Sequence, residues 1–136
     1  MRAPANGIEI EYETFGEPGR DPLLLVMGLG GQLTLWDEDF CQMLVDRGFF
    51  TIRYDNRDVG RSTYFDDAGS PDMMKLMMAS AQGEPVQAAY TLDDMADDAA
   101  GLLDALSIDR AHVVGASMGG MIAQAFAIRH GSRAKS

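Results

Sequence analysis

Apolar and polar residues alternate near the start of the chain, whereas continuous runs of apolar residues occur later. Residues 8–12 alternate apolar side chains with glutamates after a turn at residues 6–7, which predicts a half-exposed strand. Residues 23–27 are all apolar, as in a strand that is buried on both faces of a parallel sheet. Residues 49–54 and 111–115 predict two further strands.

Three other stretches space their apolar side chains as an α-helix does. The first covers residues 36–44 and is expected to end before Gly48. The second begins at Thr91, whose hydroxyl can cap the helix while Asp94 lies three residues on, and the third runs over residues 118–130. Strands that alternate with helices predict an α/β fold with a mostly parallel sheet and a functional site at the carboxyl ends of its strands. The second helix is expected to bury Met95, Ala99, Leu102, Leu103 and Leu106.

Composition narrows the class of protein. The 136 residues include 21 acidic and 11 basic side chains, a net charge of −10, which argues against nucleic acid or an anionic membrane as a partner. No apolar run approaches the ~20 residues that span a bilayer, and the amino terminus lacks the apolar core of a signal peptide. Cys41 is the only cysteine, so no intrachain disulfide is available and a cytoplasmic location is expected.

The pentapeptide Gly115-Ala116-Ser117-Met118-Gly119 is the main chemical signal in the chain. It follows a predicted strand and opens a predicted helix. A G-x-S-x-G pattern in that position is typical of a nucleophile elbow, in which small residues let the backbone bend sharply and hold the serine hydroxyl clear of the sheet. The alternative is an ordinary strand-to-helix loop whose serine caps the helix.

Three segments together carry a family resemblance. Residues 27–31, 55–62 and 115–120 resemble the α/β-hydrolase superfamily, and the wording of residues 53–58 resembles its aclacinomycin methylesterase-like esterases. The resemblance implies a serine esterase for small-molecule carboxylic esters that needs no metal or other cofactor. It also implies the roles of particular residues: Ser117 would be the nucleophile, and the backbone N–H groups of Leu29 and Met118 would form the oxyanion hole. Gly28, Gly30 and Trp36 would line the substrate site, although packing of Trp36 in the core is an open alternative.

The resembled fold takes its catalytic acid and histidine from strands that follow the elbow helix. We therefore expect one domain, residues 1–136, that corresponds to a truncated α/β-hydrolase fold of about five strands with the outer strands missing. Residues 66–90 are less regular and are expected to begin a cap segment. Adaptable methionines in that segment suit apolar ligands, although plain packing is the alternative; they are Met73, Met74, Met77 and Met78.

The general base for Ser117 is the open question. His112 lies five residues before Ser117 on one strand, ~16 Å away at ~3.3 Å per residue. His130 lies at the far end of the elbow helix, ~19 Å away at ~1.5 Å per residue. Neither is expected to reach Ser117 within one protomer. Asp55 and Asp58 leave the same sheet edge as Ser117, and one possibility is that either is a weak alternative acid or base. The other is that they shape the loop from Arg57 to Ser62, with Arg57 as their internal ion-pair partner.

The missing outer strands also predict self-association. Residues 111–115 are expected to form an apolar, unpaired sheet edge, and such an edge pairs with another copy or aggregates. We therefore expect a homo-oligomer in which a second copy could present a histidine or aspartate to Ser117. Three functions stay open: a serine esterase, a catalytically inactive hydrolase fragment, and a small-molecule binding module without turnover.

Overall fold

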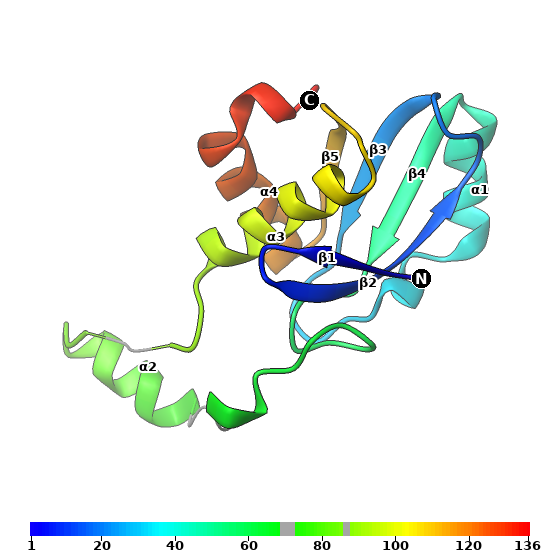
Figure 1. Cartoon of the computed structure of the whole chain (residues 1–136). Coiled ribbons are helices and arrows are strands. Elements are labelled where there is room, and N and C mark those ends of the chain that lie inside the picture. Colours follow the sequence, from blue (N-terminus) through cyan, green and yellow to red (C-terminus); the bar gives the residue numbers. More distant parts are fainter. Residues whose placement is uncertain (69–72, 86–87) are drawn as a thin grey trace.

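The computed structural model describes residues 1–68, 73–85 and 88–136 (Figure 1). Its strands are β1 (Arg2–Ala5), β2 (Ile8–Phe15), β3 (Asp21–Val26), β4 (Phe49–Tyr54) and β5 (His112–Gly115). They form one sheet in the order β1-β2-β4-β3-β5. β3 pairs in parallel with β4 and β5, whereas β1–β2 and β2–β4 are antiparallel. The α/β class and the five strands agree with the prediction, and the parallel pairing lies in the β4-β3-β5 half of the sheet.

Three helices cover the sheet: α1 (Glu38–Asp46) lies on one face, and α3 (Leu92–Ala105) and α4 (Met118–Arg129) lie on the other. The helix α2 (Met73–Ala81) lies apart from the sheet (Figure 1). Short 3-10 turns occur at Leu33–Leu35, Asp66–Ala68 and Gly131–Arg133. α1 starts later than residue 36 because the Asp37 carboxylate caps it by accepting from the Asp39 N–H. α2 is a helix within the segment that the sequence predicted as less regular. Within the described part of the chain, no helix is long and apolar enough to cross a membrane.

β3 is buried on both faces, as its continuous apolar run predicted. Leu24 and Val26 belong to the larger core cluster, which α3 and α4 help to form, while Leu23 and Leu25 pack with Cys41 of α1. This alternation follows from the two-residue period of a strand. Four of the five predicted α3 core residues are buried, Leu106 is partly buried, and the predicted capping box of α3 is present.

The predicted bare edge at β5 is wrong in one respect. After α4 the chain turns at Gly131–Arg133 and residues 133–136 run beside the outer side of β5. The Ala111 N–H donates to the Arg133 carbonyl (2.9 Å) and the Val113 N–H donates to the Ser136 carbonyl (3.0 Å). The edge is therefore partly paired. The helix α4 brings the chain back beside β5, where backbone carbonyls of residues 133–136 accept hydrogen bonds from the outward N–H groups of the strand.

Candidate active site

Ser117 lies on a sharp turn between β5 and α4. Its backbone has φ 57° and ψ −126°, a conformation that L residues rarely adopt, and its side chain is exposed. Although Ser117 stands at the N-cap position of α4, its hydroxyl makes no capping hydrogen bond. The geometry therefore favours the elbow over a loop whose serine caps the helix.

Two glycines make this turn possible. A Cβ on Gly115 would lie 2.1 Å from the Gly119 carbonyl oxygen, and one on Gly119 would lie 2.1 Å from the Val26 carbonyl oxygen. Real Cβ atoms do not come so close to backbone. The pattern at residues 115–119 thus reflects the tight packing of the turn of α4 against β3 and β5.

The loop after β3 lies directly against Ser117. A Cβ on Gly28 would be 2.9 Å from the Ser117 Cβ and 3.4 Å from its Oγ, so only a glycine fits there without displacement. The next residue, Leu29, is 78% exposed. Met118 opens α4, and the first N–H groups of a helix have no carbonyl partner within the helix. The fold therefore brings the Gly28-Leu29 backbone and the amino end of α4 to one serine.

Asp55 and Asp58 use their carboxylates to hold backbone. Asp55 is buried and accepts from the Leu33 N–H (2.7 Å) and from the Arg61 N–H (3.0 Å). Asp58, at φ 63°, accepts from the Phe65 N–H (2.6 Å) and from the Tyr90 hydroxyl. Asp55 therefore shapes the loop from Arg57 to Ser62, as one alternative predicted. Asp58 instead holds residues beyond that loop, and Arg57 forms its ion pair with neither aspartate.

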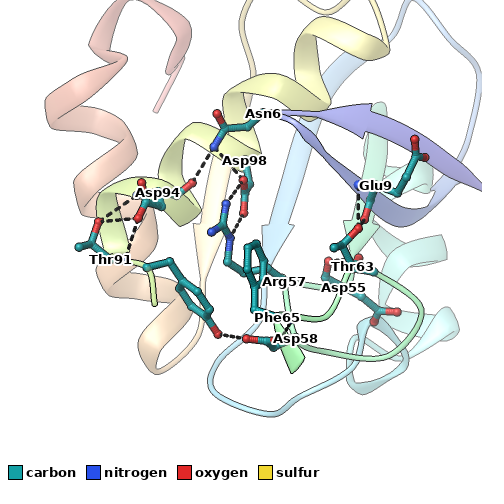
Figure 2. A network of polar contacts seen from close by, with 12 residues as sticks. Asn6, Glu9, Asp55, Arg57, Asp58, Thr63, Phe65, Thr91, Asp94 and Asp98 are labelled. Carbon is teal, nitrogen blue, oxygen red and sulfur yellow. Dashed lines mark hydrogen bonds and ion pairs between the residues drawn. The ribbon is translucent and has the colours of Figure 1, made fainter. Parts of the chain in front are cut away.

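A buried ion pair anchors the loop that follows β4. Figure 2 shows the Arg57 guanidinium facing Asp98 of α3, and two 2.7 Å hydrogen bonds join them. Burial alone would lower the pKa of Arg57, but the hydrogen bonds and charge of Asp98 outweigh it and raise that pKa. Phe65 and Tyr90 each lie about 5 Å from the guanidinium carbon, measured to their ring centroids.

Tyr90 joins this network from the far end of residues 66–90. Burial, together with its hydrogen bond to Asp58, raises the pKa of Tyr90 to about 12, so the hydroxyl stays a donor at neutral pH. Residues 65 and 90 are the two ends of the excursion that contains α2, and their rings pack 5.4 Å apart. The ion pair and the two rings thus bring both ends of the excursion together.

Both histidines lie in carboxylate pairs away from Ser117. His112 contacts Asp21 through Nε2 (2.9 Å) and Ser136 through Nδ1 (2.7 Å), at the opposite end of β5. His130 ends α4 and contacts Asp97 of α3 through Nε2 (2.7 Å). The expected separation of both histidines from the elbow agrees with these contacts.

The other residues that the sequence predicted for the site, Trp36, Gly30 and the methionines, are not placed at Ser117 by any described contact. Trp36 stacks on Phe40 and packs with the cluster beneath α1, which matches the core alternative, while substrate contact by Trp36 and Gly30 stays a prediction. Met73 has no described side chain, so its predicted role lies outside the described residues. Among the described side chains, no group of three or more His, Cys, Asp or Glu could hold a metal ion.

Sequence reasoning overlooked two buried polar residues that support the site, Asn56 and Asp98. Asp98 could have been suspected, because it lies on the apolar face of α3 between Met95 and Leu102, where an unpaired carboxylate would be costly. Asn56 gives no such signal, since its partner is a backbone carbonyl in another loop.

Comparison with known proteins gives consistent matches. A family model described as the alpha/beta hydrolase fold matches residues 21–136. Rhodomycin D methylesterase DauP of Streptomyces sp. (strain C5) is 37% identical over 116 residues, 85% of this chain and 33% of that protein. The enol-lactonase from Burkholderia xenovorans LB400 matches with a TM-score of 0.75 and 30% identity, over 98% of this chain and 44% of its own. This chain spans about a third of the length of the curated methylesterase.

Proposed function

Because this chain belongs to the alpha/beta hydrolase fold family, we propose that it acts as a serine hydrolase on small carboxylic esters, with Ser117 as the nucleophile. The observation that carries the proposal is the positive φ of Ser117, on a glycine-packed turn against Gly28. Strain of this kind persists only where the surrounding structure enforces it, and it is common at catalytic residues. Similarity to a methylesterase supports an ester as substrate.

In the proposed reaction, the Ser117 Oγ attacks the ester carbonyl carbon while a base accepts the hydroxyl proton. The carbonyl oxygen becomes an oxyanion, which accepts hydrogen bonds from the Leu29 and Met118 N–H groups. Collapse expels the alcohol, which takes the proton from the base, and leaves an acyl group on Ser117. Water then hydrolyses the acyl-enzyme with the same base.

We propose that a histidine or aspartate of a second copy supplies the base. Within one protomer, His112 lies at the opposite end of β5 from Ser117 and His130 lies at the far end of α4. The Asp55 and Asp58 oxygens hold backbone N–H groups. The apolar side chain that we propose for self-association at the partly paired β5 edge is Val114, which is exposed on the face of the sheet that α1 covers. Met121 and Ile128 are exposed on α4, which lies against the other face.

Self-association is tested by sedimentation at micromolar concentration. We expect at least a dimer, weakened in Val114→Lys because Val114 is 41% exposed and carries little of the core. Val113→Lys is a poorer test, since Val113 packs against the main core cluster. A stable wild-type monomer would overturn the proposed assembly.

A second candidate function is binding without turnover, by an inactive hydrolase unit. It is favoured by one observation: within the described part of the chain, the Ser117 hydroxyl has no hydrogen-bond partner, and so no base. Such a unit would hold an ester or carboxylate at the Leu29 and Met118 N–H groups without cleaving it.

Hydrolysis of an aryl acetate separates the two functions. Wild type should release the phenol faster than buffer, and Ser117→Ala should return the rate to that of buffer while its circular dichroism stays unchanged. Oxyanion stabilisation and binding alone give ~10³- to 10⁴-fold rate enhancements in serine proteases, so a detectable rate needs no complete triad. Equal rates for both proteins would leave only the binding function.

The excursion over residues 66–90 is proposed to begin the substrate cap. α2 lies on the side of the sheet toward which the β4 arrow points (Figure 1), and an apolar hollow there is lined by Met74, Met77, Met78 and Ala81. Met77→Glu should raise KM for long-chain aryl esters and leave KM for the acetate unchanged.

We also propose a cytoplasmic location. The support for it is that the chain has a single cysteine, Cys41, which is buried as a free thiol.

A further inference from the structure

The loop that carries Leu29 is held at its two ends by two adjacent buried residues. The Asn56 Nδ2 donates to the Met27 carbonyl (2.8 Å), just before Gly28. The Asp55 Oδ1 accepts from the Leu33 N–H (2.7 Å), where the Leu33–Leu35 turn begins. Both Asp55 and Asn56 are at most 3% exposed.

Asp55 is itself firmly fixed to the sheet. Its N–H donates to the Glu11 carbonyl of β2 (3.0 Å), and its carbonyl accepts from the Ser62 hydroxyl (2.6 Å). Its second carboxylate oxygen accepts from the Arg61 N–H. A Cβ on Gly60 would lie 2.1 Å from that oxygen, so the glycine leaves room for the carboxylate.

The other side of the loop is bounded by the elbow. The Gly28 position lies against Ser117, and the Met27 carbonyl lies 2.8 Å from where a Cβ on Gly119 would stand. Between the two held ends, Leu29 is 78% exposed and therefore depends on its neighbours for its position. A loop of six peptide units fixed at both ends has little freedom to move its central N–H group.

We propose that Asn56 and Asp55 are positioning residues that clamp the loop and aim the Leu29 N–H at the ester oxyanion. The proposal rests on the proposed function of Ser117. Neither side chain touches the substrate; each acts through the backbone of residues 27–33. An oxyanion donor works only when it is held near the position of the developing charge, so loosening either end should slow the chemical step and spare ground-state binding.

The test compares Asn56→Ala and Asp55→Asn with wild type and with Asn6→Gly. Asn6 is the matched control, because its side-chain amide, like that of Asn56, donates to a backbone carbonyl, and its φ of 52° suits glycine. Its partners are Asp94 and Asp98 of α3 and not residues 27–33. We expect Asn56→Ala to lower kcat for an aryl acetate by about 10- to 100-fold with KM within about twofold. Asp55→Asn should lose less, because its amide oxygen can still accept from Leu33. Asn6→Gly should keep wild-type kcat.

Amide hydrogen exchange of residues 28–35 gives a second readout that needs no turnover. Both clamp variants should exchange faster there than wild type and Asn6→Gly. Unchanged exchange in both, or faster exchange with unchanged kcat, would overturn the proposal. If wild type shows no Ser117-dependent turnover, the proposed function fails, and exchange alone decides whether the clamp exists.

Discussion

A serine lies near each end of β5, and the two serines have different surroundings. At the amino end, the Ser136 hydroxyl contacts His112, and His112 contacts Asp21, so a Ser-His-Asp series of hydrogen bonds is complete. At the carboxyl end, Ser117 has the strained turn, the glycine packing and the helix amino terminus, but no histidine contact.

Of the two arrangements, only the one at the carboxyl end requires a particular packing of the backbone. A hydrogen-bonded series of the right residue types can arise wherever a histidine needs partners at a surface. A strained serine that requires glycines at Gly28, Gly115 and Gly119 cannot arise without the packing that enforces it. The carboxyl end is therefore organised around one side chain, whereas the amino end joins the last residues of the chain to the sheet.

The two largest expected effects are of similar size, and the first comes from the glycines at the carboxyl end. Gly119→Ala should destabilise the protein by about 3 kcal/mol or more, because its methyl group would overlap the Val26 carbonyl and neither backbone can give way. Gly120→Ala is the matched control: its Cβ would meet nothing closer than 3.6 Å, so stability should change by less than about 1 kcal/mol. Urea denaturation of both variants checks this. Equal stability would mean that the turn is less tightly packed than described.

The next effect contrasts the buried ion pair of the carboxyl end with the exposed one of the amino end. Asp98→Ala leaves the Arg57 guanidinium buried without its carboxylate partner, and this should lower the free energy of unfolding by about 3 to 5 kcal/mol. Asp21→Ala removes contacts to Lys135 and His112 that are partly exposed to solvent, and its melting temperature should fall by no more than about 2 °C. A larger loss in Asp21→Ala than in Asp98→Ala would reverse the comparison.

The smallest effect is a pH dependence at the amino end. The Lys135 hydrogen bond, followed by that of His112, lowers the pKa of Asp21. Because the folded-state pKa lies below the unfolded value of about 3.9, this contribution to stability is complete above that value and is lost as pH falls through the folded pKa. The stability of wild type should therefore drop more steeply below about pH 4 than that of Asp21→Asn. Melting temperatures from pH 2 to 6 check this, and parallel curves would contradict it.

Local signals in the sequence predicted much of the fold. β4 has the predicted bounds, and the Thr91 capping box set the start of α3, because each depends on residues within a few positions of one another. The turn at Ser117 was also predicted from a local signal, since its glycines and its serine lie within five consecutive residues. Two features were missed for different reasons. β1 pairs with the neighbouring β2 across the turn at residues 6–7, but it is a four-residue edge strand that contains Pro4, and a proline argues against a strand in the sequence. The return of residues 133–136 to β5 depends on residues that lie more than 20 positions earlier in the chain.

The support around the candidate site was the least predictable part. Arg57 and Asp98 are 41 positions apart, and Asn56 bonds a backbone carbonyl 29 positions away. A hydrogen bond to a carbonyl leaves no compositional trace, because any residue supplies that acceptor. Motif reading therefore identified Ser117 and the loop of Leu29, and only the three-dimensional contacts identified the residues that hold them.

Labelling by a fluorophosphonate, with the modified serine identified by peptide mass spectrometry, decides which end of β5 carries the chemistry. We expect modification at Ser117 and none at Ser136, because only Ser117 lies on a strained turn at the amino terminus of a helix, where the N–H groups can stabilise the negative charge that develops on the reagent. Modification at Ser136 with Ser117 unlabelled would contradict this expectation and would assign the chemistry to the other end of β5.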